Sequence, residues 1–180
     1  KIARLLSKTF NTNQYKLQTE LKELLPKINA ELASLPFSNY ALENHPLFNS
    51  FDIINLHWVA NEMLDYQRFF SSCKKPIVWT LHDMNPFQGI FHYKNDMLLN
   101  HAIAGKLDDF ILNLKHQSIL AFSGKMHIVA PSVWLTDASS KSTIFSKFPH
   151  STIQYSLNLN TFKLYSKTQA RQELGLPTEG

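Results

Sequence analysis

Four short segments that favour β-strands recur after residue 50, and residues with helical periodicity separate each from the next. They are rich in β-branched and large apolar side chains and cover residues 52–59, 76–82, 126–132 and 151–157. Strands that alternate with helices are typical of right-handed βαβ crossovers, which produce a parallel sheet. The sequence therefore predicts an α/β fold with a Rossmann-like parallel sheet of about four strands. The nearly unbroken apolar run at 76–82 also predicts burial of the sheet on both faces.

Helical patterns surround this predicted sheet. Residues 1–50 are expected to form a helical N-terminal segment, which Pro26 should kink or break because proline lacks the backbone donor. Residues 51–165 carry the sheet. The helices expected between its strands cover residues 61–72, 106–124 and 133–145, with Gly124 as the cap of the second.

Residues 166–180 are expected to form a closing helix that links to a further domain. Ser166 and Gln169 have the spacing of a capping box, Gly175 suits a C-terminal cap, and Pro177 blocks continuation of the helix.

Composition narrows the classes of protein. The net charge of +4 is mild and its basic residues are scattered, so nucleic-acid binding is not favoured. The single cysteine, Cys73, excludes an internal disulfide and a multi-cysteine zinc site. The sequence contains no signal-peptide core and no apolar run of the ~20 residues that a transmembrane helix needs, which favours a cytoplasmic protein. Nucleophile-elbow, Walker and G-x-G-x-x-G motifs are absent.

Polar side chains follow the predicted strands, at the edge where open parallel sheets bind ligands. His57 follows the first strand, His82 and Asp83 follow the second, and Ser132 follows the third at the start of a helix. His82 could act as a base, as a hydrogen-bond donor to a developing charge or as a binder of sugar hydroxyls, or it could simply be a hydrogen-bonded histidine at a strand end. For His57 the structural interpretation is favoured by its apolar surroundings in the sequence. No spacing among these residues supports a metal site.

Four segments taken in order carry a family resemblance: "DIINLHWV", "KPIVWTLHDMNPFQGIFHY", "IVAPSVWL" and "TFKLYSKTQARQELGLP". From about residue 46 onward, the chain resembles the N-terminal half of bacterial family 4 glycosyltransferases of the branch that builds capsular, colanic-acid-like and other exopolysaccharides. Those enzymes are retaining and have the GT-B fold, in which two Rossmann-like domains face each other across a cleft. The resemblance implies transfer of a sugar from a nucleotide-sugar donor to a glycan or lipid-linked acceptor, without a metal or other cofactor.

The resemblance also implies roles for individual residues, with departures from the family pattern at Asn85, Ile90 and Phe91. The implied catalytic residues are His82 and Asp83. The implied acceptor-binding residues are Asn85, Gln88, Gly89, His92 and Tyr93, and the implied cleft-lining residues are His57, Ser132 and Trp134. The aromatic residues Trp79, Phe87 and Phe91 are instead expected to pack in the core.

Relative to that family, the chain lacks the first strand of the sheet and the whole donor-binding domain. It is therefore expected to be a fragment that is inactive alone, with an open edge at 52–59 that the N-terminal helices or a second copy would cover. The family's work on surface polymers suggests peripheral contact with the inner face of the membrane. The alternative from another class is a non-catalytic α/β module that uses the same strand ends to bind a small anionic ligand or a protein.

Overall fold

The computed structural model describes residues 2–179, with side chains described from residue 13 onward. Four parallel strands pair in sequence order, β1-β2-β3-β4, which confirms the predicted α/β, Rossmann-like sheet. The strands are shorter than the sequence patterns suggested, because only three to five residues of each segment pair in the ladder. Their bounds are β1 Ile54–Leu56, β2 Ile77–Thr80, β3 Met126–Ala130 and β4 His150–Thr152.

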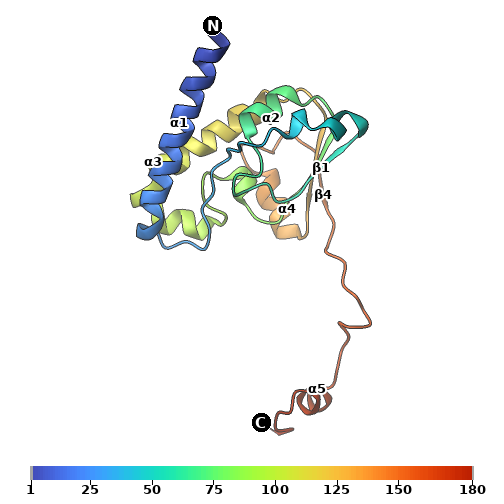
Figure 1. The fold of residues 1–180 in the computed structure, drawn as a ribbon. Helices are drawn as coiled ribbons and strands as arrows, with labels where there is room; N and C mark the ends of the chain where they lie inside the picture. The colour runs from blue at the N-terminus through green and yellow to red at the C-terminus, as the bar shows by residue number, and fades with distance from the viewer. Residues whose placement is uncertain (1, 180) are drawn as a thin grey trace.

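Three helices connect the strands and contact the same face of the sheet (Figure 1). From α2 (Tyr66–Ser72), Phe70 stacks on Trp79 with ring centroids 5.5 Å apart. From α3 (Lys94–Leu120), Ile119 joins the same buried cluster. From α4 (Val133–Ser140), Ser139 hydrogen-bonds His150. His150 pairs with Ile128, which pairs with Trp79, so the three side chains lie on the same face of the sheet.

The opposite face of the sheet is less covered, so the prediction of burial on both faces was wrong. In β2, Ile77 and Trp79 are buried but Val78 and Thr80 are half-buried. The cause lies in the strand order. Crossovers that are all right-handed and always step to the next strand in one direction place their helices on one face. The apolar run at 76–82 could not reveal that the helices cover one face only, because the sequence of one strand does not determine the order of the strands in the sheet.

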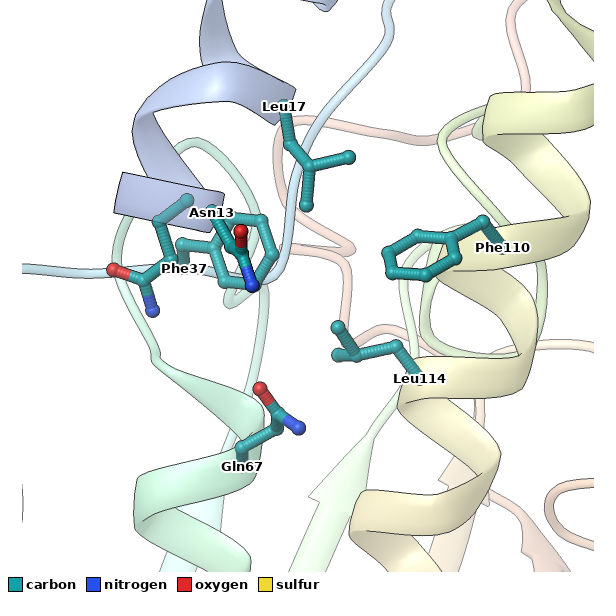
Figure 2. Close-up of a pocket in the computed structure, with 7 residues that line it drawn as sticks. Asn13, Leu17, Phe37, Gln67, Phe110 and Leu114 are labelled. Atoms are coloured by element: carbon teal, nitrogen blue, oxygen red, sulfur yellow. The ribbon is translucent and has the colours of Figure 1, made fainter. Parts of the chain in front are cut away.

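The N-terminal helix α1 (Ile2–Leu24) ends in the short 3-10 helix η1 (Leu25–Lys27), where Pro26 stops it as expected. The helix packs beyond α3 rather than on the sheet, and its buried Leu21 belongs to a cluster with Phe91 and Ile111. A hollow of about 160 Å³ lies between α1, α2 and α3 (Figure 2). Its lining combines three amide side chains with apolar ones: Asn13, Gln14, Gln67, Leu17, Phe37, Phe110 and Leu114.

The outer strand β1 has the 3-10 helices η2 (Leu42–Asn44) and η3 (Pro46–Ser50) beside it rather than α1. Leu42 and Phe48 pack against the core here and border a hollow of about 290 Å³ that reaches Ile54. The edge of β1 is therefore covered only in part, by η2 and η3, and not by the long N-terminal helix α1.

The C-terminal segment leaves the body of the protein after β4 (Figure 1). Its closing helix α5 (Lys167–Glu173) is capped as predicted: the Ser166 side chain accepts a hydrogen bond from the Gln169 backbone, and Gly175 has a φ of +65°. Gly124 does not cap α3, which ends four residues earlier at Leu120. It instead lies against the Phe122 ring and the Lys75 carbonyl.

Candidate functional site

Three side chains at the ends of three strands form a row of rings at one edge of the sheet. His57 Nδ1 lies 3.0 Å from His82 Nε2, and His82 Nδ1 lies 2.5 Å from the Tyr155 hydroxyl. The rings also stack, with centroids 5.3 Å apart for the two histidines and 5.6 Å apart for His82 and Tyr155. Side chains alternate between the two faces along an extended chain. By this alternation, all three side chains point to the same face of the sheet as Thr80 and Ser151, which is the less covered face.

His82 is exposed, yet both of its ring nitrogens have hydrogen-bond partners. One consistent arrangement has the Tyr155 hydroxyl donating to Nδ1 while Nε2–H donates to His57 Nδ1. Partial burial lowers the pKa of His82, and the neighbouring His57 lowers it further, against the smaller opposing effect of Asp83. The imidazole is therefore held in its neutral form near pH 7, which can both donate and accept.

Asp83 points the other way from His82 and is 7% exposed. Its Oδ2 accepts hydrogen bonds from Trp58 Nε1 at 2.9 Å and from His92 Nδ1 at 2.6 Å, and its Oδ1 accepts from the Asn85 backbone at 2.9 Å. Burial alone would raise the pKa of Asp83, but these three donors, led by His92, outweigh it and lower the pKa. The ionised carboxylate thus fixes the turn that follows β2.

His92 extends this network to the N-terminal segment. Its Nε2 lies 2.9 Å from Ser34 Oγ, which lies 3.0 Å from Asn61 Oδ1. The order Ser34–His92–Asp83 matches that of a serine-hydrolase triad. However, Ser34 is 3% exposed and its hydroxyl donates a hydrogen bond to Asn61 Oδ1. The cluster therefore joins segments of the chain and does not present a nucleophile.

Lys115 of α3 organises the loop that follows Asp83. This fully buried ammonium group lies 2.7 Å from the Asn85 and Gly89 carbonyl oxygens, and 3.1 Å from the Gln88 carbonyl and Asn85 Oδ1. Burial lowers the pKa of Lys115 to about 7, against the opposing effects of Asp108 and Asp83. Asn85 adds bonds from its amide to the carbonyls of Ile90 and Phe91. Three residues predicted to bind an acceptor, Asn85, Gln88 and Gly89, thus belong to a loop that Lys115 holds together and that includes the 3-10 helix η4 (Asn85–Phe87).

The other predicted residues lie at the same edge with different degrees of exposure. Ser132 caps α4 by accepting a hydrogen bond from the Leu135 backbone at 3.2 Å. The next turn exposes Trp134, at 61%. Tyr93 is exposed at the start of α3, and its pKa is raised by partial burial and by nearby acidic groups, Asp83 first among them.

The predicted site residues therefore differ in exposure. His57, His82, Tyr93 and Trp134 are exposed, Gln88 and Ser132 are half-buried, and Asp83, Asn85, Gly89 and His92 are buried. The predicted core residues Trp79, Phe87 and Phe91 are buried, as expected.

Sequence reasoning missed two residues of this site, Tyr155 and Lys115. Strand alternation beyond 151 would have placed Tyr155 on the side of His82. Lys115 lies four residues after Ile111 and four residues before Ile119, on the apolar stripe of the helix, so this spacing was the signal that could have revealed its burial.

Comparisons of the chain with models of protein families, with curated proteins and with solved structures found no match. None of the helices in the described part of the chain has the length and apolar character needed to cross a bilayer. Within that same part, no three histidine, cysteine or acidic side chains converge as a metal-binding group.

Proposed function

We propose that this chain is the acceptor-side domain of a retaining glycosyltransferase, which uses a nucleotide-sugar donor and a glycan or lipid-linked acceptor. One observation carries the proposal: His82 stands exposed at the carboxyl end of β2, with its pKa lowered, between the rings of His57 and Tyr155. This is the position where an open parallel sheet presents its ligand-binding groups.

The chemistry of the exposed edge suits a carbohydrate. Neutral imidazoles and phenols can each donate and accept hydrogen bonds, as sugar hydroxyls require. The exposed rings of Trp134 and Tyr93 supply the flat apolar surface that also complements sugars. His82 would hydrogen-bond the transferred sugar or stabilise charge that develops near the reacting carbon.

The supporting network fits the same function. Hydrogen bonds to Asp83 and Lys115 hold the loop 85–89 in place, so that its position does not depend on a ligand. This loop and Tyr93 would shape the acceptor site. The nucleotide of the donor would be held by a separate domain of the complete enzyme, and contact with a membrane surface would bring a lipid-linked acceptor to the site.

A direct assay tests the proposed activity. The full-length protein of the same gene is incubated with a panel of uridine, guanosine and adenosine diphosphate sugars, and release of nucleoside diphosphate is measured with and without bacterial glycans. We expect release from at least one donor, stimulated by an acceptor. Binding of glycans without release from any donor would contradict sugar transfer and favour the non-catalytic module.

A further inference from the structure

The role proposed for His82 meets a geometric conflict. A ligand hydroxyl needs a free ring nitrogen, yet His57 occupies Nε2 and the Tyr155 hydroxyl occupies Nδ1. An imidazole has no third nitrogen to offer. One of the two partners must therefore move before His82 can contact a ligand.

The two partners differ in how firmly they are held. His57 directly follows β1, and its carbonyl accepts a hydrogen bond from the buried Trp79 indole at 3.2 Å. Tyr155 belongs to the C-terminal segment, and the Ile153 backbone bond to Ala130 is the last that ties this segment to the sheet ladder in the described residues. The Tyr155 side chain is also 56% exposed. Tyr155 is therefore the partner that can leave at low cost.

We propose that the Tyr155 hydroxyl stands in for a sugar hydroxyl on His82 Nδ1, and that a carbohydrate ligand displaces it. The inference rests on the proposed function, because it adds the step that lets a sugar reach His82. A phenol and a sugar hydroxyl offer the same donor and acceptor, and the Tyr155 ring covers the imidazole at an interplanar angle of 12°. Tyr155 thus competes with the ligand for His82 Nδ1.

The competition has a defined energetic consequence. When the binding-competent state is a fraction of the population, the apparent dissociation constant rises by the inverse of that fraction. Removing the Tyr155 hydroxyl breaks one hydrogen bond of the covered state, which corresponds to about a 2- to 10-fold change in the open fraction. Tyr155→Phe should therefore expose His82 more often without altering the site beneath it.

Chemical modification of His82 tests the covered state without a sugar. Diethyl pyrocarbonate acylates free imidazole nitrogens, and its rate at His82 is followed by peptide mass mapping at pH 8, where the ring is neutral. We expect Tyr155→Phe to raise this rate by about 2- to 10-fold, and Tyr155→Ala to raise it further because stacking is lost as well. The control Tyr165→Phe, in the same segment, should leave the rate unchanged. Equal rates in wild type and both Tyr155 variants would overturn the proposal.

Steady-state kinetics of the full-length protein then test displacement by the sugar. Tyr155→Phe should lower KM for the donor or the acceptor by a similar factor and leave kcat close to its wild-type value. An unchanged or higher KM together with a lower kcat would overturn the competition, and would make Tyr155 part of the machinery for transfer. The modification assay contains no sugar donor, so its result does not depend on whether the protein transfers a sugar. A failure of this inference can therefore be distinguished from a failure of the proposed function.

Discussion

At the scale of the residue, two neighbours at the end of β2 have opposite environments. His82 faces the exposed edge, while Asp83 is buried and accepts three hydrogen bonds. The difference follows from the alternation of side chains along an extended chain. The same pair of residues therefore supplies a surface imidazole and the carboxylate that fixes the turn beneath it.

The lowered pKa of His82 leads to a first prediction. Partial burial and the adjacent His57 both disfavour the imidazolium, so His57→Ala should raise the pKa of His82 towards its ordinary value. Titration of the imidazole resonances by NMR measures this change. The variant His101→Ala, on the surface of α3, should leave the pKa of His82 where it is. A pKa that stays low in His57→Ala would show that the two rings are not coupled.

Linkage gives the sign of the effect on stability. Because the folded-state pKa of His82 lies below the unfolded value of about 6.5, the unfolded state binds more protons between the two values. The contribution of His82 is therefore fully present above about pH 6.5 and is lost as the pH falls below it. Chemical unfolding curves should show a smaller loss of stability between pH 7 and pH 5 in His57→Ala than in wild type.

At the scale of the element, one buried amine, that of Lys115, contacts three carbonyl oxygens of the loop 85–89. Lys115→Met removes the donor that the carbonyls of Asn85, Gln88 and Gly89 share. We expect the free energy of unfolding to fall by ~3 kcal/mol, the upper end of the range for one orphaned polar group, because several are orphaned at once. Urea unfolding measures the loss. Lys106→Met, exposed on the same helix, is the matched control and should change stability little.

The same lysine gives stability a pH dependence. Its folded-state pKa of about 7 lies below its unfolded value of about 10.4, so folding releases a proton between these values and stability from this group rises with pH. The difference in free energy of unfolding between wild type and Lys115→Met should grow from pH 7 to pH 9. A difference that stays constant over this interval would mean that the folded state keeps the charged amine.

Part of the fold and of the site could be predicted at this scale. The strands β1, β2 and β3 were found by their apolar and β-branched residues, and α5 was found by Ser166 and Gly175, because these signals are local. The strand β4 overlaps the expected segment 151–157 only at Ser151 and Thr152. The start of α3 at Lys94 was missed, since its first turns lack an apolar stripe. The helix expected at 61–72 begins only at Tyr66, because Asn61 and Glu62 adopt positive φ. His82 was found from its strand end, whereas the contact of Tyr155 with it depends on tertiary structure.

At the scale of the whole molecule, the sheet has helices on one face and carries an extended C-terminal segment (Figure 1). The side chains of that segment from Leu157 onward are mostly exposed, including Leu159, Phe162 and Leu164. A helix of seven residues such as α5 gains little stability alone. The segment beyond Tyr155 should therefore add little to the stability of the domain.

Truncation tests this independence. Ending the chain after Asn158 keeps Tyr155 and its contact with His82 but removes the exposed residues that follow. We expect Tm to change by no more than about 2 °C, as for the loss of surface contacts. A large fall in Tm would show that α5 packs on the domain in solution.

The measurement that tests the central claim most directly is turnover of nucleotide sugar by the full-length protein with His82 replaced. His82→Ala should lower kcat by at least ~100-fold, as expected for a group that stabilises charge in the transition state. His101→Ala should retain wild-type turnover, and circular dichroism should confirm that both variants fold. Near-normal turnover in a folded His82→Ala protein would contradict the assignment of the site.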